Sequence, residues 1–456
     1  MKNVDPWKNR PRATEEEIAE LVEEISPVMN SVHKYKFSRR FWRIAIGDHV
    51  KSCLNRRQNL LSNRKTPYIT FRPIDAPVVP SRKDGFVSDV LEIAKTNLRS
   101  SWHDEAAYKV PEKTKHILVG DFDPPNKAKD ESIRLTTDYF ISGRGDRLKR
   151  KKLILESERN GSDLGRAVLI TMPRAFVEHL DGILYRMREL SNAGGLSIHV
   201  EHYDSVITKI YAALLVERGA RLIQYQPGGD FGEIKSLVEA TRYNDIDEFR
   251  TYGWKIHEKD VPHCAIRLAK FKARYDQADA KHKYDCLVVL NLARDESVQS
   301  RYRGILDTFA DQLSTKFRIC VRARAKSRRI RLPVLAGWPR FQRGAVIDPG
   351  FGDMARRVKQ SMVVVHLDHP STNFLECLYV DHPVVALQTN SDPTGIVQPY
   401  YVELERLGVF HQTTESLVKH LAQSDIPGWW RKVTEASVYR EFKDTFARSC
   451  RLEKVS

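Results

Sequence analysis

The sequence predicts an α/β protein with two Rossmann-like domains. Residues 196–241 alternate strand, helix, strand, glycine turn and helix, and residues 286–422 repeat this alternation in a longer series. Residues 362–387, "MVVVHLDHPSTNFLECLYVDHPVVAL", show the pattern most clearly, since two fully apolar runs typical of buried parallel strands flank a polar turn and a helix. We therefore expect two parallel sheets that face a cleft, with ligands at the carboxyl ends of the strands.

The domain boundary is expected near residue 280. Residues 1–280 would form an N-terminal Rossmann-like domain with a helical extension, and residues 281–456 a C-terminal one with a helical tail. The extension begins with a capping box, Thr14 with Glu17. Further elements are expected as follows: a helix at 39–50, strands at 68–71, 116–119 and 167–172, a helix at 176–190, and a surface strand with a basic linker at 253–281.

The second alternating series supplies the elements of the C-terminal domain. Strands are expected at 286–292, 317–324, 345–350, 362–367 and 383–387, and helices at 302–313, 351–361, 372–380 and 415–422.

Composition is that of a soluble globular protein, with 41 % hydrophobic and 29 % charged residues among 456. No run approaches the roughly 20 apolar residues of a membrane span, and the N-terminus lacks a secretory apolar region, so a cytoplasmic location is expected. The six cysteines are scattered without a CxxC pair, which supports neither a zinc site nor a disulfide framework. Cys286, Cys320 and Cys377 lie in or beside apolar runs, and we expect them to pack in the core.

The net charge of +16 favours anionic partners: polyanions, anionic lipid surfaces or nucleotide-linked substrates. Basic residues are densest at 144–152 and 322–331. The first stretch is also typical of a solvated loop, and the second of a solvated linker. Nucleic-acid binding is disfavoured, because no RNP-like, KH-like or zinc-finger pattern occurs and no aromatic residues alternate with the basic ones.

The turn at 369–372 is a candidate phosphate site. It joins the carboxyl end of a strand to the start of a helix, where free backbone N–H groups and the helix dipole favour an anion. Ser371 and Thr372 would contact the phosphate, and Glu376, one turn later, would reach ribose hydroxyls. The alternatives are that Ser371 and Thr372 only cap the helix and that Glu376 is an exposed helix charge. For His366 and His369 the alternative is a structural role.

A second candidate turn follows the strand at 221–225. Gly228 and Gly229 allow a close backbone approach to a ligand, or simply form a turn. Asp230 and Glu233 come next and are candidate general bases, the alternative being carboxylates that answer a helix dipole.

Two arginines end the strand at 317–324. The guanidinium groups of Arg322 and Arg324 could bind a diphosphate through bidentate hydrogen bonds. The alternative is that both side chains face solvent.

Three blocks of the sequence resemble a known transferase family of bacterial surface-carbohydrate (polysaccharide) biosynthesis with the two-domain GT-B glycosyltransferase architecture. They are "RRFWRIAIGDHV" (39–50), "QYQPGGDFGEIKSLVEATRYNDIDEFRTYGW" (224–254) and "STNFLECLYVDHPVVAL" (371–387). The chain departs from the family where Gln-His-Gly-Gly becomes Gln226-Pro227-Gly228-Gly229, and where Gly-Pro of the first block becomes Gly47-Asp48.

The resemblance implies a glycosyltransferase that moves a sugar from a nucleotide-sugar donor to a hydroxyl of a bacterial surface glycan or lipid-linked acceptor. The donor would bind the C-terminal domain through Ser371, Thr372, His369, Glu376 and the two arginines, and the acceptor the N-terminal one. Walker, GxSxG, HExxH and GxGxxG motifs are absent from the sequence. We expect a reaction without metal or cofactor, with the leaving phosphate held by helix dipole and basic side chains. Peripheral contact with the anionic inner face of the plasma membrane is expected. The alternatives are a nucleic-acid-binding protein, or a polyol-phosphate transferase or sugar epimerase on the same scaffold.

Overall fold

The computed structural model divides the chain into two compact units. Unit 1 comprises Met1–Gln224 and Asn244–Asp247, and unit 2 comprises Tyr225–Tyr243 and Glu248–Ser456. The structure describes residues 13–61, 116–119, 132–135, 146–186, 196–201, 206–239, 241, 243–279, 281–290, 296–313, 315–323, 345–348, 350, 352–389 and 392–450. This division differs from a boundary near residue 280, because residues 225–243 and 248–279 pack with the C-terminal part of the chain.

Unit 1 combines parallel strands with helices. Its strands follow the order β2-β1-β3-β4, and all three neighbouring pairs are parallel: β1 (His116–Val119), β2 (Ser132–Leu135), β3 (Ser197–Val200) and β4 (Arg221–Tyr225), whose last residue begins unit 2. Its helices are α1 (Glu15–His33), α2 (Arg39–Leu61), α4 (Arg147–Asn160), α5 (Asp163–Ile170), α6 (Arg174–Val177), α7 (Leu180–Arg186) and α8 (Val206–Glu217). Helix α2 packs against α1 and α8, and α4 packs against α1 and α5.

Several predictions for unit 1 are confirmed. The capping box joins Thr14 and Glu17 in both directions at the start of α1. Phe41 and Trp42 of α2 are fully buried, as its apolar face predicts, and β1 and β3 lie where strands are expected. The predicted strand at 68–71 lies outside the described residues.

The strand predicted at 167–172 is wrong, because these residues belong to α5 and the turn after it. A short apolar run fits either structure. Here the side chain of Ser162 accepts a hydrogen bond from the backbone N–H of Gly165 and starts a helix. The helix predicted at 176–190 is divided into α6 and α7.

The first family-like block anchors a short turn of unit 1. Arg43 is buried, and its Nε donates to Asp245 Oδ1 at 2.5 Å. Arg40 Nη2 donates to Asp247 Oδ1 at 2.8 Å. The arginines of "RRFWRI" therefore fasten Asn244–Asp247 to α2, which is a structural role for the block.

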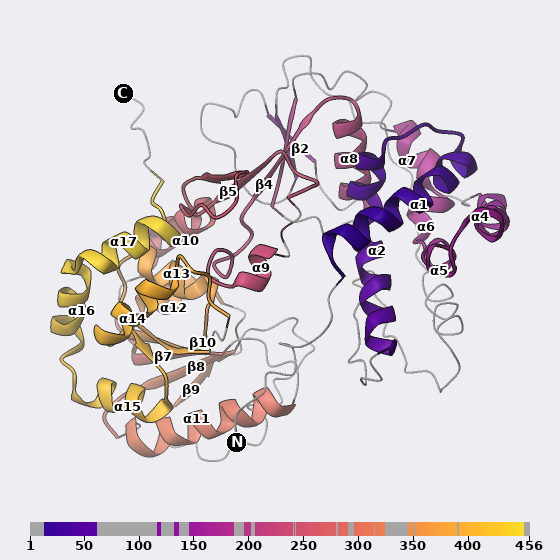
Figure 1. Ribbon diagram of the computed structural model, residues 1–456. Coiled ribbons are helices and arrows are strands. Elements are labelled where there is room, and N and C mark those ends of the chain that lie inside the picture. Colours follow the sequence, from indigo (N-terminus) through magenta and orange to yellow (C-terminus); the bar gives the residue numbers. More distant parts are fainter. Residues whose placement is uncertain are drawn as a thin grey trace, which may run out of the picture. The chain divides into compact units, whose positions relative to one another are not determined.

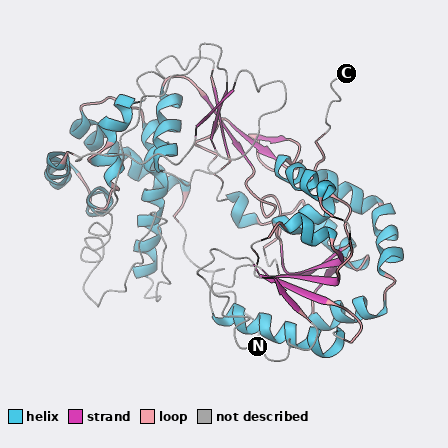
Figure 2. Ribbon diagram, turned by 180° about the vertical axis from the view of Figure 1, so that it is seen from behind, coloured by secondary structure: helices cyan, strands magenta, loops and turns pink. Residues whose placement is uncertain are grey.

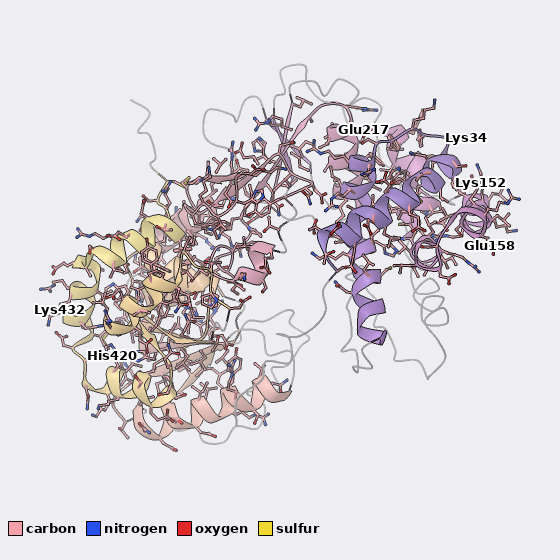
Figure 3. All side chains as sticks on the ribbon, viewed as in Figure 1. Lys34, Lys152, Glu158, Glu217, His420 and Lys432 are labelled. Atoms are coloured by element: carbon pink, nitrogen blue, oxygen red, sulfur yellow. A yellow bond between two sulfur atoms is a disulfide. The ribbon has the colours of Figure 1, made fainter. Side chains whose placement is uncertain are left out.

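The basic stretch at 144–152 is helical from Arg147 onward, so the loop interpretation is wrong for the described part. Arg150 pairs with Glu178 at 2.8 Å, and Lys149 pairs with Asp181. Both Lys152 and Glu158 extend outward from α4 in Figure 3, so both signs of charge occur on this helix. Residues 324–331 of the second basic stretch lie outside the described residues.

Unit 2 is built on a six-stranded parallel sheet with the order β12-β11-β10-β7-β8-β9. Its strands are β7 (Tyr284–Leu290), β8 (Ile319–Ala323), β9 (Val346–Asp348), β10 (Ser361–His369), β11 (Val384–Gln388) and β12 (Phe410–His411). Counted in chain order, this is the doubly wound arrangement 3-2-1-4-5-6. Unit 2 also contains the parallel strand pair β5 (Glu248–Thr251) and β6 (Asp260–Pro262).

Helices cover both faces of this six-stranded sheet (Figures 1 and 2). The helices of unit 2 are α9 (Lys235–Glu239), α10 (Ile266–Gln277), α11 (Glu296–Leu313), α12 (Met354–Lys359), α13 (Thr372–Tyr379), α14 (Gln398–Arg406), α15 (Thr414–Gln423), α16 (Ile426–Glu435) and α17 (Ser437–Phe446). Helix α10 packs against α12 and α13 on one side of the sheet, and α11 packs against α15 on the other. The described helices include none long and apolar enough to span a membrane.

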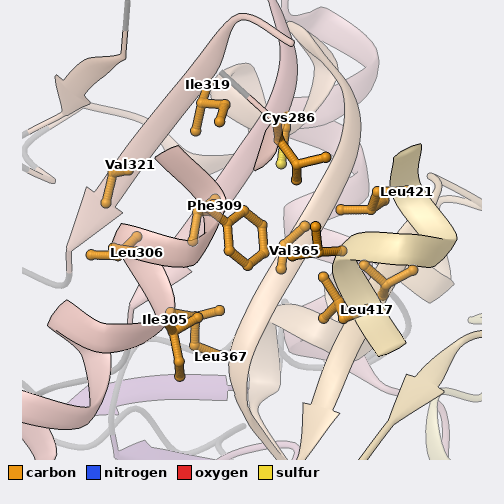
Figure 4. Close-up of a cluster of buried hydrophobic side chains, with 14 of the residues drawn as sticks. Cys286, Ile305, Leu306, Phe309, Ile319, Val321, Val365, Leu367, Leu417 and Leu421 are labelled. Carbon is orange, nitrogen blue, oxygen red and sulfur yellow. The ribbon is translucent and has the colours of Figure 1, made fainter. Parts of the chain in front are cut away.

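One core of unit 2 lies between the sheet and the pair α11 and α15. Figure 4 shows Phe309 of α11 among Cys286, Val365 and Leu417, all of them fully buried. Every strand predicted for this half of the chain and the helices α11, α12, α13 and α15 are present, and an α/β fold with two parallel sheets is confirmed.

The basic linker predicted at 253–281 is wrong in its second half, where residues 266–277 form α10. Leu268 and Phe271 are buried one turn apart on this helix, and the charged residues around them conceal a weak amphipathic pattern. Strand β5, helix α14 and strand β12 were not predicted.

A disulfide joins Cys264 and Cys450, so the expectation that the cysteines form no disulfide is wrong for this pair. The two lie 186 residues apart in the sequence, and no spacing rule reveals such a pair. The other four cysteines are buried and are not disulfide-bonded, including the three expected in the core.

Candidate functional site

The strand order of unit 2 marks one position in its sheet for a ligand. After β9 the chain returns to the other side of β7 and enters β10, which is the topological switch point of a doubly wound sheet. Ligands of such sheets bind at the carboxyl ends of the strands at this point. Helix α13 begins there, directly after β10.

The amino end of α13 has the form of an anion site. Ser371 is its N-cap, and its Oγ accepts the N–H of Phe374 at 3.2 Å. Among the described residues, none accepts a hydrogen bond from the backbone N–H of Thr372 or Asn373. Such N–H groups, at the positive end of the helix dipole, favour a phosphate.

The two candidate turns meet at this point, because the glycine turn lies against the start of α13. The backbone N–H of Gly229 donates to Thr372 Oγ1 at 2.9 Å. A Cβ atom on Gly229 would lie 2.9 Å from both Thr372 Cα and Leu375 Cδ1, whereas one on Gly228 would meet only Thr372 Oγ1, at 3.1 Å. Only glycine at position 229 permits this approach without a shift.

Gln226 holds the glycine turn from within. Its side chain is 2 % exposed. Its Oε1 accepts from the backbone N–H of Tyr252 and from Trp254 Nε1, both at 2.8 Å. Its Nε2 donates to the carbonyl oxygens of Gly228 at 2.6 Å and Phe231 at 3.3 Å. All four hydrogen-bonding positions of the amide are used.

Further contacts fix the outside of the turn. Arg267 Nη1 of α10 donates to the carbonyl of Pro227 at 2.8 Å. Thr394 Oγ1 donates to the carbonyl of Gly232 at 2.6 Å. Gly232 has φ +84°, a backbone conformation that favours glycine, and lies against Trp254.

Beneath the N-cap, His366 is 1 % exposed and its Nδ1 lies 3.3 Å from Ser371 Oγ. Burial, aided by His369, lowers the pKa of His366 to about 3. His366 is therefore neutral at pH 7 and supports the cap.

Glu233 and His369 form a buried pair. His369 Nε2 lies 2.9 Å from Glu233 Oε2, which also accepts from the hydroxyl of Tyr401 at 2.8 Å. Both side chains of the pair are fully buried, and the His369 ring packs against Phe374 and Phe410. The pair joins the glycine-turn segment to the end of β10.

Glu376 is half-buried on α13, one turn after Thr372. Asn373 Nδ2 donates to its Oε2 at 2.6 Å. Burial raises the pKa of Glu376, and Asn373 and Arg267 counteract part of this effect.

The guanidinium group of Arg322 binds other groups of unit 2. Its Nη1 donates to Asp348 Oδ2 at 2.7 Å and its Nη2 to the carbonyl oxygens of Gly350 and Gly352. Burial alone would raise the pKa of Asp348, but the N–H of Gly350 and the guanidinium groups of Arg322 and Arg357 hold it below its usual value. Arg324 lies outside the described residues.

The structure thus brings together most of the residues expected from the sequence. Five of them lie around the start of α13: Gly228, Gly229, Ser371, Thr372 and Glu376. Glu233 and His369 form the buried pair at the end of β10, and Arg322 pairs with Asp348 of β9. The sequence does not predict four further residues that hold this region: Gln226, Arg267, Thr394 and Tyr401. Only Gln226 carried a signal, as part of the second family-like block.

Acid is expected to destabilise unit 2 through its buried histidines. Burial lowers the pKa of His382 to about 3, against 6.5 when unperturbed. Between these values the unfolded chain binds the additional proton, so the free energy of unfolding falls as the pH decreases, by up to about 1.4 kcal/mol per pH unit for each such histidine. Denaturant titrations from pH 7 to pH 4 should show this slope, and His382→Gln should make it shallower. Parallel curves for the two proteins would contradict this origin.

The fold is that of an α/β protein in which helix α13 begins at the switch point of a parallel sheet. Residues 144–453 match the model of the LIC12162 family of transferases, more than half of the chain. The chain belongs to this family, which confirms the expected transferase class. None of the curated proteins matches the sequence.

Several solved structures are similar at low identity. Anabaena Alr3699/HepE in complex with UDP and glucose has a TM-score of 0.38 and 10 % identity, over 74 % of this chain and 96 % of that chain. The wall teichoic acid polymerase TagF has a TM-score of 0.31 and 11 % identity, over 59 % and 81 %. A mutant of Thermobaculum terrenum O-GlcNAc transferase has a TM-score of 0.32 and 13 % identity, over 94 % and 86 %.

Proposed function

We propose that the protein is a glycosyltransferase of the GT-B type that binds the diphosphate of a nucleotide-sugar donor at the start of α13. The observation that carries the proposal is the open amino end of α13 at the switch point, with the glycine turn placed against it. Membership of a transferase family supports it.

In this proposal the chain's own groups neutralise the leaving phosphate. The N–H groups of Thr372 and Asn373 and the helix dipole would bind it. Arg267 adds a positive charge next to the glycine turn, where it donates to the carbonyl of Pro227. Glu376 would accept hydrogen bonds from the ribose. No metal or cofactor is part of the proposed reaction. The hydroxyl acceptor on a surface glycan or lipid, the cytoplasmic location and the peripheral membrane contact belong to the same proposal.

Burial favours Asp230 over Glu233 as the general base. Glu233 is fully buried and accepts from Tyr401, whereas Asp230 is half-buried at the turn. Asp230→Asn should lower turnover at least about 100-fold with little change in melting temperature. Glu233→Gln should instead lower the free energy of unfolding by about 1–3 kcal/mol, since a buried hydrogen-bonded group is disrupted. Full activity of Asp230→Asn would exclude Asp230 as the base.

The phosphate site is tested by a charge placed at the first position of α13. Thr372→Asp introduces an acidic residue where a helix favours one, but its charge repels a bound phosphate. Thermal shifts should be measured with UDP, CDP, GDP and dTDP, because a ligand that binds the folded state raises the melting temperature. We expect one nucleotide to shift the parent protein and at least tenfold weaker binding by Thr372→Asp.

The matched control is Thr414→Asp, which places the same charge at the first residue of α15. It should bind the nucleotide as the parent does. Equal binding by Thr372→Asp would refute the site. With the nucleotide identified, the mass of the product distinguishes sugar transfer from polyol-phosphate transfer and from epimerisation.

A further inference from the structure

The Cys264–Cys450 disulfide lies at one end of a continuous series of hydrogen bonds that leads to the candidate site. Arg448, two residues before Cys450, donates its backbone N–H to the carbonyl of Tyr252 at 2.9 Å. The N–H of Tyr252 in turn donates to Gln226 Oε1. Gln226 Nε2 holds the carbonyl of Gly228, and Gly229 donates to Thr372.

The same segment is attached at two further points. The N–H of Ala265, next to Cys264, donates to the carbonyl of Arg448 at 2.9 Å. The N–H of Cys450 donates to the hydroxyl of Tyr379 at 3.0 Å, and Tyr379 is the last residue of α13. Residues 448–450 therefore connect the residue before α10, Tyr252 and the last residue of α13, and Tyr252 leads to the glycine turn through Gln226.

These two cysteines differ from the other four. Cys264 and Cys450 are half-buried, and their Cα atoms lie 4.8 Å apart, as a disulfide requires. Cys53, Cys286, Cys320 and Cys377 are buried and are not disulfide-bonded. Burial raises the pKa of the Cys286, Cys320 and Cys377 thiols, which suppresses their reactive thiolate forms.

We propose that Cys264 and Cys450 form a reversible thiol–disulfide site, and that its reduction loosens the glycine turn and weakens nucleotide binding. The effect on binding rests on the proposed function, whereas the redox site and its effect on the turn do not.

The reaction is thiol–disulfide exchange with a small dithiol. A thiolate of the dithiol attacks one sulfur, the Cys264–Cys450 bond breaks, and a mixed disulfide forms. The second thiol of the reagent resolves it and leaves a cyclic disulfide. Each cysteine sulfur gains one electron and one proton, which the dithiol supplies, and oxidation by a small disulfide reverses the exchange.

The first measurements need no nucleotide. Peptide mapping without reductant should recover a peptide pair linked through Cys264 and Cys450. Dithiothreitol should lower the melting temperature by about 5–15 °C, because the bond closes a loop of 186 residues. Hydrogen–deuterium exchange should become faster over residues 226–232 in the reduced protein. Absence of the linked pair, or exchange unchanged in the turn, would overturn the proposal.

The nucleotide measurement follows with the member of the UDP, CDP, GDP and dTDP panel that binds. Reduction should weaken its binding about fivefold, a usual size for coupling between two sites. The variant Cys264→Ser/Cys450→Ser should bind like the reduced protein and should not respond to dithiothreitol. Equal affinity of the oxidised and reduced proteins would overturn the coupling. If no nucleotide binds either form, the proposed function fails, while mapping and exchange still decide the redox site.

Discussion

Replacing Gly229 by alanine is expected to weaken nucleotide binding at least tenfold and to lower the free energy of unfolding by about 1–3 kcal/mol, the usual cost of overpacking. The added methyl group would lie 2.9 Å from Thr372 Cα, which is backbone and cannot rotate away. The turn must then move off α13 and lose the bond from Gly229 to Thr372 Oγ1. Thermal melts with and without nucleotide measure both effects.

Two other glycines provide controls for this variant. Gly228→Ala should have a smaller effect, because its Cβ would meet only the Thr372 hydroxyl, at 3.1 Å. Gly304→Ala in α11 should stabilise the protein by up to about 1 kcal/mol, since nothing lies within 4 Å of its Cβ position and alanine favours helices. Parent-like binding by Gly229→Ala would show that the turn does not need to lie against α13.

Gln226→Glu is expected to lower the free energy of unfolding by about 3–5 kcal/mol at neutral pH, as a buried unpaired charge does. The substitution keeps the shape of the side chain but replaces its N–H donors by an oxygen. That oxygen would face the carbonyl oxygens of Gly228 and Phe231. Urea denaturation measures the loss, and proteolysis within residues 226–232 should become faster.

The control is Gln398→Glu, the same change at an exposed position in the first turn of α14. A negative charge is tolerated or favoured there. Equal stability of Gln226→Glu and Gln398→Glu would mean that the four hydrogen bonds of Gln226 contribute little.

The fold and half of the site were predictable because they depend on local patterns. Buried strands such as 362–367 show long apolar runs, and a polar turn followed by a helix gives the position of Ser371 and Thr372. The failures have physical causes. The run at 167–172 is compatible with a strand or a helix, and the cap at Ser162 decides between them. Helix α10 carries too many charged residues for its two buried side chains to stand out.

Contacts between distant residues were the other limit. Arg322 lies near the end of a strand, as predicted, but its partner Asp348 comes 26 residues later and pairs with its charge. Glu233 was predicted to be an accessible carboxylate, but it is buried and contacts His369 and Tyr401, which lie far away in the sequence. The pairing of Cys264 with Cys450 has no local signal at all.

The division of the chain also bears on how the protein is made. The polypeptide passes between the units after Gln224, after Tyr243 and after Asp247, so neither unit is an uninterrupted piece of chain. A ribosome releases the glycine turn of unit 2 before it completes unit 1 at Asp247. The partner of Gly229, Thr372, follows 143 residues later. During synthesis the glycine turn therefore emerges before α13, its packing partner, has been made. Unit 1 is complete before α13 is made and can fold first.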